Sequence, residues 1–532
     1  MIEVNDFRQR LFLGLVYAGL TVTVLTGLSC AVNSKSSVDE KRPNIVFLFS
    51  DDQRYDSLGC MGNKYIKTPH LDKIGNEGII FANHYNNTSI CMPSRAIVMT
   101  GMHEYKTGCS FQHGPLDRKL FDLSYPVQLR KAGYYVGFAG KFGFGVVDGL
   151  GSEGVWHKEE AMPKDDFDFW AGWPGQGKYK SAENGYIAKF KDKYPHTTRA
   201  LGAAGQDFIK EASKSGKPFC LSVSFKAPHG PASPDPEYDD LYDGVEFPKP
   251  ANYGPEAGQH LSPQAKSNRQ VRMFKGWSEG KFQEHLSKYY RQIYAIDVAV
   301  GMIRQELQTQ GVADNTVIIY MTDNGYSTGS HGFGGKTLPY EEAARSPLLI
   351  YDPRMPASKR GKRAAALTGS IDMAPTMLEL AGAPIPEKMD GKSLVGLLEN
   401  PKEKVRDDML FTQVWGPLSN HSLTVITPEY KYIYWMYGGE GMTPCEELFD
   451  MKNDRLEMHN LAADPKHAAG LNRMRTLYDQ YVDQWKKDCY PAYGYPEHGI
   501  LADRHLSWEE KMKQVPLTKS RDGSPAIDKK RK

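Results

Sequence analysis

The chain has 532 residues, 40% of them hydrophobic and 24% charged, which is ordinary for a globular protein and excludes large-scale disorder. Its 66 lysines and arginines against 64 aspartates and glutamates leave a formal net charge of +2, so the molecule as a whole has no electrostatic field that would attract nucleic acid. We therefore expect no nucleic-acid partner, and any recognition of anions must be local.

The N-terminus predicts export. Arg8 and Arg10 precede an apolar run over residues 11–28, which is the pattern of a signal segment. The run ends in L-T-G-L-S-C, which is similar to a lipoprotein signal with Cys30 as the lipid-bearing residue, although a glycine stands where such signals usually carry leucine. A cleaved signal and a retained single-span anchor are the alternatives. All three predict an exported protein, periplasmic or at the outer membrane or cell surface, whose membrane contact is limited to an N-terminal lipid or anchor.

Strands and helices alternate beyond this segment. The run I-V-F-L-F-S after Asn44 predicts a strand buried on both faces, and the amphipathic stretches predict helices. The fold class that follows is α/β, with a large mixed, mostly parallel sheet flanked by helices. Further strands are expected at 134–139, 218–225, 316–322 and 347–351, and helices at 68–77, 125–131, 282–310 and 372–381.

The pattern changes after a loop at 384–392. Residues 423–426 and 430–434 alternate as hairpin partners around Pro428, and a helix is expected over 464–486. We therefore expect a smaller C-terminal α+β subdomain. The predicted organisation is an export signal at 1–30, a linker at 31–41, a catalytic domain at 42–400, the subdomain at 401–515 and a frayed polar tail at 516–532.

The segment C-M-P-S-R-A-I-V-M-T-G, from Cys91 to Gly101, carries the strongest chemical signal. Ser94 can cap a helix that begins at Arg95, which would put Cys91 at the positive end of that helix, where anions bind. Arg95 adds a forked cation that suits the oxygen pair of a sulfate or phosphate. The segment predicts a reactive cysteine beside an anion site.

Two acidic pairs follow predicted strands. Asp51 and Asp52 come after the first strand, and Asp323 and Asn324 come after the strand at 316–322. Because parallel strands end at the same edge of a sheet, the four side chains are expected to meet there. An all-oxygen set of this kind selects calcium or magnesium over zinc.

The pattern C-x-P-S-R, followed by an apolar run and T-G, resembles the signature of type I sulfatases of the alkaline phosphatase superfamily, and the resemblance spans about residues 42–465. It implies that a formylglycine-generating or sulfatase-maturing enzyme oxidises Cys91 to Cα-formylglycine. It further implies that residue 91 binds a calcium ion together with the four residues named in the preceding paragraph. Asn324 is diagnostic, because related phosphonate and phosphate ester hydrolases commonly place histidine at this ligand.

The resemblance also assigns catalytic and substrate-binding residues. Arg95, Lys141 and Lys336 are expected to neutralise the sulfate oxygens, and His229, in K-A-P-H-G-P, is expected to contact the substrate and to protonate the leaving oxygen. Arg345 is either structural or substrate-facing. One hydroxyl of the hydrated aldehyde would attack sulfur, and the second would expel sulfate as the aldehyde re-forms.

One position departs from the family pattern. Gly143 stands where sulfatases usually carry a histidine that hydrogen-bonds the formylglycine hydroxyl. His331, His103 and His113 are the candidates to replace it.

The substrate expected from export, the family pattern and an aromatic-rich segment is a sulfated carbohydrate. That segment contains Trp156, Phe167, Phe169, Trp170 and Trp173, which either stack on sugars or belong to the core. The alternatives are a phosphonate or phosphate ester hydrolase of the same superfamily and a catalytically silent glycan-binding surface protein.

The chain contains seven cysteines. Cys30 and Cys91 have the roles described above, and five remain. A disulfide between Cys445 and Cys489 and buried free thiols are equally expected, and no spacing indicates a zinc site.

Overall fold

The computed structural model describes residues 42–151, 154–520 and 523–527. The predicted export signal with Cys30 and the linker lie outside the described residues. Within the described part of the chain, no helix is both long and apolar enough to cross a membrane.

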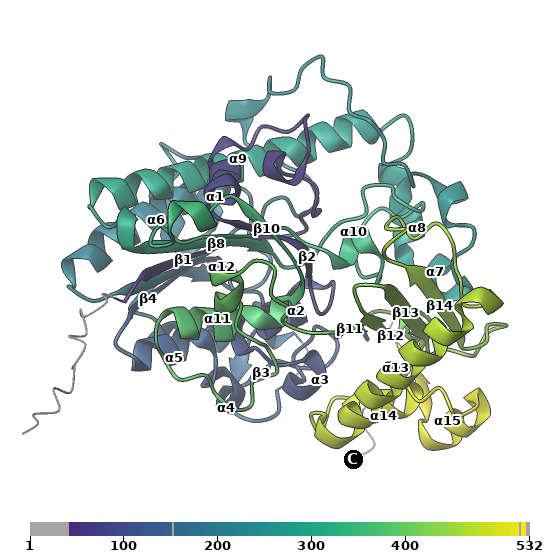
Figure 1. Ribbon diagram of the computed structural model, residues 1–532. Coiled ribbons are helices and arrows are strands. Elements are labelled where there is room, and N and C mark those ends of the chain that lie inside the picture. The colour runs from purple at the N-terminus through teal and green to yellow at the C-terminus, as the bar shows by residue number, and fades with distance from the viewer. Residues whose placement is uncertain (1–41, 152–153, 521–522, 528–532) are drawn as a thin grey trace, which may run out of the picture. The chain divides into compact units, whose positions relative to one another are not determined.

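An eight-stranded sheet forms the centre of the molecule, in the order β10-β2-β9-β8-β1-β7-β4-β6 (Figure 1). β9 is antiparallel to both of its neighbours, and every other pairing in the sheet is parallel. The predicted α/β fold with a mixed, mostly parallel sheet is therefore confirmed. The strands are β1 (Asn44–Ser50), β2 (Ile79–Tyr85), β4 (Tyr135–Lys141), β6 (Phe169–Trp173), β7 (Phe219–Ser224), β8 (Thr316–Thr322), β9 (Leu348–Tyr351) and β10 (Lys362–Gly369).

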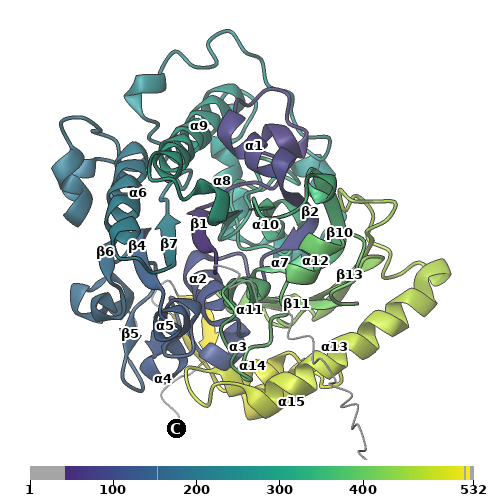
Figure 2. The same cartoon turned by 60° about the vertical axis from the view of Figure 1, so that its left-hand side comes forward.

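Helices cover both faces of this sheet, as the two views show (Figures 1 and 2). β1 is buried along its whole length because alternate side chains meet opposite layers: Phe47 packs in one apolar cluster and Leu48 in the other. The helices on the Phe47 side include α2 (Cys91–Thr100), α5 (Tyr125–Lys131) and α11 (Met373–Leu380), and those on the Leu48 side include α1 (Pro69–Glu77), α6 (Thr197–Lys214) and α9 (Phe282–Thr309).

A second, four-stranded antiparallel sheet lies in the C-terminal part, in the order β11-β12-β13-β14. The helix α13 (Ala468–Asp488) packs on it, and the predicted hairpin around Pro428 joins its two central strands. Tyr85 of the large sheet and Phe411 of the small one share an apolar cluster, so the two sheets are packed together. The strands are β11 (Met409–Gln413), β12 (Ser422–Ile426), β13 (Tyr430–Trp435) and β14 (Cys445–Asp450).

The remaining helices and strands are short. Within the predicted tail, the described residues include a two-stranded antiparallel hairpin, β15 with β16. These elements are α3 (Glu104–Thr107), α4 (Arg118–Phe121), α7 (Pro263–Lys266), α8 (Arg269–Met273), α10 (Glu341–Ala344), α12 (Val395–Glu399), α14 (Tyr495–Leu501), α15 (Trp508–Gln514), β3 (Leu116–Asp117), β5 (Val146–Val147), β15 (Leu517–Lys519) and β16 (Pro525–Ile527).

The six cysteines of the described residues are all free thiols. Of the two expectations for Cys445 and Cys489, the structure therefore shows free thiols and no disulfide. Cys445 instead donates to the Gln264 side-chain oxygen, 3.2 Å away.

Candidate active site

The two acidic pairs meet at one edge of the large sheet. β1 and β8 are parallel neighbours in register, so Asp51 and Asp52 emerge beside Asp323 and Asn324. The backbone N–H of Asp52 donates to Asp323 Oδ1 at 3.2 Å, and Asn324 Nδ2 donates to Asp52 Oδ1 at 2.7 Å. All four side chains are buried, as the sheet geometry predicts.

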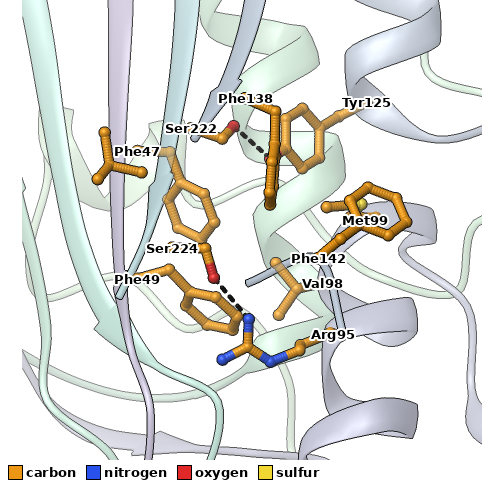
Figure 3. A pocket seen from close by; sticks show the side chains of 11 residues that line it. Phe47, Phe49, Arg95, Val98, Met99, Tyr125, Phe138, Phe142, Ser222 and Ser224 are labelled. Carbon is orange, nitrogen blue, oxygen red and sulfur yellow. Dashed lines mark hydrogen bonds between the residues drawn. The ribbon is translucent and has the colours of Figure 1, made fainter. Parts of the chain in front are cut away.

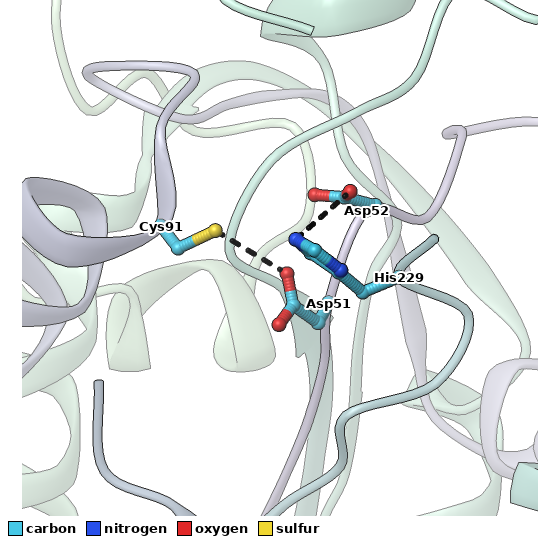
Figure 4. A group of neighbouring side chains, drawn as sticks. All are labelled: Asp51, Asp52, Cys91 and His229. Carbon is cyan, nitrogen blue, oxygen red and sulfur yellow. Dashed lines mark hydrogen bonds and ion pairs between the residues drawn. The ribbon is translucent and has the colours of Figure 1, made fainter. Parts of the chain in front are cut away.

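The helix α2 delivers Cys91 to this edge (Figure 4). It begins at Cys91 itself, with Ile90 at the N-cap, so Ser94 lies inside the first turn and does not cap the helix as expected. The Ser94 hydroxyl instead donates to the backbone carbonyl of Asp323, and its N–H donates to the carbonyl of Ile90 within the first turn. Cys91 therefore lies at the positive end of a ten-residue helix, and its Sγ is 3.5 Å from Asp51 Oδ1.

Two lysines converge on these groups from other parts of the chain. Lys336 Nζ lies 2.8 Å from Cys91 Sγ and also contacts Asp52 Oδ1. Lys141, the last residue of β4, places its Nζ 2.5 Å from Asp51 Oδ2 and is fully buried. Both lysines that were predicted from the sequence are therefore beside residue 91 or its carboxylate neighbours.

Arg95 lies beside the ring of Phe49 and the hydroxyl of Ser224 (Figure 3). Its Nε donates to Asp323 Oδ2 at 2.9 Å, and its Nη1 donates to Ser224 Oγ and to the Lys141 carbonyl oxygen. The side chain is 1% exposed and stacks on Phe49. The guanidinium of Arg95 is thus held by residues around Cys91, and its contact with sulfate stays a prediction.

Gly143, where the family pattern has histidine, has a physical reason to be glycine. Its backbone has a φ of +92°, and a Cβ built there would lie 2.4 Å from Arg95 Cδ. No side chain fits at this position while Arg95 holds its present conformation.

Burial and neighbouring charges set the protonation of the site. Burial and the nearby Asp51 raise the pKa of the Cys91 thiol to about 12, so the unmodified thiol is protonated near neutral pH. Burial by itself would raise the pKa of the Asp51 carboxyl. The nearby charges of Lys141, His229, Arg95 and Lys336 outweigh this effect and hold that pKa well below its usual range. Burial and Asp51 raise the pKa of Asp323 to about 7. The cluster thus keeps Asp51 charged and leaves Asp323 easy to protonate.

His229 follows β7 and faces the same cluster (Figure 4). Its Nδ1 lies 2.6 Å from the carbonyl oxygen of Gly230, and its Nε2 lies 3.8 Å from Asp52 Oδ2. Burial lowers the pKa of His229 to about 4, although Asp52 and Asp51 oppose this shift. The imidazole is therefore neutral near pH 7 in the absence of a bound anion, and Nε2 is the nitrogen that points into the cluster.

Three histidines, His331, His103 and His113, were the candidates to replace the histidine that is absent at position 143, and none of them lines the cleft above Cys91. Each of them contacts residues outside the cluster around Cys91. His331 Nε2 contacts Asn252 at 3.0 Å, His103 stacks on Tyr105, and His113 places its two ring nitrogens near the carbonyl oxygens of Tyr493 and Val414.

Arg345 is not brought into the cluster. Its guanidinium contacts Glu341 and the carbonyl oxygen of Ala82, and it stacks on Tyr55. Of the two readings left open for Arg345, these contacts support the structural one.

A cleft opens above Cys91, with a volume of about 400 Å³. Trp156 is the member of the aromatic-rich segment that lines it, whereas Phe167, Phe169 and Trp173 are buried in the core. Sequence reasoning missed several of the lining residues because they come from loops without a motif. The lining consists of Ile90, Cys91, Phe111, Gln112, Trp156, Gln176, His229, Arg269, Lys336 and Trp415.

Lys226 is a further residue that sequence reasoning did not assign. It lies three residues before His229 in the same motif, is 7% exposed, and its Nζ lies 5.1 Å from the ring of Tyr179. Burial lowers its pKa, although Asp51 opposes this shift. In the sequence, its place in the motif K-A-P-H-G-P, three residues before His229, could have indicated that Lys226 lies near the site.

Comparison with known proteins identifies the family. The family model described as Sulfatase matches residues 43–383, more than half of the chain. The chain belongs to the sulfatase family. A second family model, described as the C-terminal part of N-sulphoglucosamine sulphohydrolase, matches residues 329–484. The protein is a type I sulfatase, and hence a sulfuric ester hydrolase, which confirms the resemblance drawn from the sequence.

Relatives of this sulfatase have a variety of described activities. An N-acetylglucosamine-6-O-sulfatase of Bacteroides thetaiotaomicron is 26% identical over 88% of this chain and 90% of its own. An ulvan-active sulfatase of Formosa agariphila is 27% identical over 86% of this chain and 83% of its own.

Solved structures share the fold. A structure described as a complex with its substrate D-glucosamine-2-N,6-O-disulfate matches with a TM-score of 0.68 and 25% identity, covering 84% of this chain and 99% of that one. A phosphonate monoester hydrolase of Agrobacterium radiobacter matches with a TM-score of 0.68 and 21% identity, over 92% of this chain and 100% of its own, and this likeness concerns the fold alone.

Proposed function

We propose that this sulfatase hydrolyses sulfate monoesters of a sulfated carbohydrate, with residue 91 as formylglycine and with a bound calcium ion. The observation that carries the proposal is the position of Cys91, which begins a buried helix on the floor of a cleft, 2.8 Å from the ammonium group of Lys336. The names of the relatives, which include sugar and polysaccharide sulfatases, support the substrate class.

The oxygen atoms at the strand ends fit a hard cation. Donor atoms of Asp51, Asp52, Cys91 and His229 all lie within 4.8 Å of one another, and Asp323 is in contact with Asp52. Asn324 Oδ1 is buried and has no hydrogen-bond partner among the described residues. Such an oxygen is costly to leave unsatisfied and is a suitable calcium ligand. Asp51, Asp52, Asp323 and Asn324, with an oxygen of the modified residue 91, would hold the ion, which would polarise a sulfate oxygen.

The modification explains why a protonated cysteine stands at the centre of the site. A hydrated aldehyde would supply one hydroxyl to attack sulfur and a second to release sulfate, which neither cysteine nor serine can do. Cys91 is 1% exposed, so a maturing enzyme must reach the signature before the chain has folded around it.

The other residues of the cluster bind the ester and move its proton. Lys336 and Lys141, which lie beside Cys91 and Asp51, would bind the sulfate oxygens, and Arg95 holds Asp323 and the Lys141 carbonyl in place. An anionic ester next to His229 Nε2 opposes the charge of the lysines, raises the pKa of the imidazole and allows Nε2 to protonate the leaving oxygen.

The domain limits and the cellular location complete the proposal. We place the catalytic domain at 42–400 and the C-terminal subdomain at 401–515, and we propose export by residues 1–30. Mass spectrometry of the mature N-terminus from the native host distinguishes a lipid on Cys30 from plain cleavage and from a retained segment.

The decisive experiment combines mass spectrometry of the peptide that contains residue 91 with sulfate release from a panel of sulfated sugars. We expect formylglycine at position 91, sulfate release by the wild type, and loss of turnover in Cys91→Ser. Near wild-type release by Cys91→Ser would overturn the formylglycine proposal. Faster turnover of matched phosphate or phosphonate esters would favour the alternative hydrolase function within the superfamily.

A further inference from the structure

The cleft above Cys91 continues into a second hollow. That hollow has a volume of about 580 Å³ and shares His229, Arg269 and Lys336 with the first. Its walls carry apolar and aromatic side chains, among them Trp277 and Tyr326. A ligand that reaches residue 91 can therefore extend past these three shared residues.

Arg269 differs from the other arginines near the site. Within the described residues, its guanidinium has no carboxylate within 4 Å and makes no hydrogen bond, whereas Arg54, Arg95 and Arg345 each contact a carboxylate. It lies 4.5 Å from the ring centroid of Trp415, which comes from the loop after β11. Stacking of this kind holds a guanidinium plane in position while leaving its N–H edges free.

The surroundings of Arg269 favour an anion. In the described part of the chain, the first hollow has no carboxylate in its lining, and the second has only Asp52, which is already bound by Lys336. Burial lowers the pKa of Arg269, but the ordinary pKa of arginine is far above neutrality, so the side chain keeps its positive charge. A cation that is fixed, unpaired and next to the reacting centre gains most from an anionic group of the substrate.

We propose that Arg269, stacked on Trp415, binds a second anionic group of the substrate, separate from the sulfate that is cleaved. The inference rests on the proposed function and narrows its substrate class to sugars that carry another sulfate or a carboxylate near the reacting ester. A guanidinium binds a sulfate or a carboxylate with two parallel hydrogen bonds. The experiment below therefore includes probes that distinguish a second sulfate from a carboxylate.

The test compares a sugar that has one anionic group with sugars that have two. The probes are N-acetylglucosamine 6-O-sulfate, glucosamine-2-N,6-O-disulfate and a monosulfated disaccharide with a uronate. Binding to the Cys91→Ser protein is measured by calorimetry, and sulfate release by the matured enzyme is measured in parallel. We expect at least one probe with two anionic groups to bind roughly tenfold or more tightly than the monosulfate.

Arg269→Ala should remove this preference by weakening only the probes with a second anion, and Arg269→Lys should restore it in part because it keeps the charge without the planar fork. Arg272→Ala is the matched control, since it removes a positive charge from the same helix α8 at a residue that does not line either hollow. Equal affinities of all probes for the unsubstituted site, or an unchanged preference in Arg269→Ala, overturn the inference. Failure of sulfate release with the preference intact counts against the proposed function alone.

Discussion

Gly143 and Arg95 show how one missing side chain shapes the site. The Arg95 chain passes where a Cβ at position 143 would be, and from there it reaches Asp323 and the Lys141 carbonyl. The loss of the family histidine and the position of Arg95 are therefore one structural feature. Any residue larger than glycine must displace Arg95, and with it the groups that surround residue 91.

Gly143→Ala tests this coupling. We expect it to lower the free energy of unfolding by about 1–3 kcal/mol more than a strain-only control, because it adds overpacking to backbone strain. We also expect kcat/KM to fall roughly 10- to 100-fold, since groups at the reacting centre tolerate little displacement. The control is Gly149→Ala, which has a φ of +70° and nothing within 4 Å of the added Cβ. Thermal unfolding and initial rates measure both effects, and equal losses in the two variants would contradict the account.

The ends of β1 and β8 act as one unit at the level of elements. Their parallel register places three carboxylates and one amide within contact of each other, although the two strands are more than 260 residues apart in sequence. Three carboxylates are buried here, and burial, together with repulsion from Asp51, raises the pKa of Asp323. A divalent cation bound between them would relieve the repulsion and join the two strands.

Removal and return of calcium tests this arrangement without relying on activity. We expect calcium to raise the melting temperature of chelator-treated protein by several degrees, because a ligand that binds only the folded state stabilises it. Asn324→Ala should lose most of that shift, since it removes the unpartnered Oδ1. The control Asp479→Asn lies on α13, where Asp479 pairs with Arg504, and should keep the shift. A calcium response that is absent, or the same in both variants, would refute the site.

At the level of the whole molecule, the C-terminal helices are tied to the catalytic part by buried polar groups. Glu104 of α3 is 1% exposed and accepts a hydrogen bond from the Tyr495 hydroxyl of α14 at 3.0 Å. Burial raises the pKa of the Glu104 carboxyl to about 8. The folded molecule therefore holds this carboxyl in its protonated form across the acidic and neutral range.

This protonation predicts a pH-dependent stability. Because the folded pKa is above the ordinary value of 4.5, unfolding releases a proton, and stability falls as pH rises from about 4.5 to about 8. The difference corresponds to about 4 kcal/mol over that range. Glu104→Gln keeps the acceptor without the charge, so it should be more stable than the wild type at pH 8 and similar at pH 4.5. Chemical denaturation at both pH values measures this, with exposed Glu509→Gln as the control; parallel pH profiles of wild type and Glu104→Gln would exclude the effect.

Sequence alone was sufficient for the large sheet, the family and most of the cluster, because strand patterns and short motifs are local. The motifs around Cys91, Lys141, His229 and Lys336 place a chemical group at a helix start, at a strand end or in the loop after a strand, and the structure brings these residues together. The register of parallel strands then makes the meeting of Asp51 with Asp323 a consequence of their positions.

The tertiary structure decided what depends on packing between distant segments. Ser94 was expected to cap a helix, but a carbonyl more than 200 residues away was the available acceptor. Arg95 does not line the cleft, because its guanidinium contacts the buried carboxylates of Asp323 and Asp51. Arg269 and Trp415 have no motif, and only the packing of α8 against the loop after β11 brings them together at the mouth of the site. Local patterns thus determined which chemical groups the protein carries, whereas contacts between remote segments determined which side chains line the cleft.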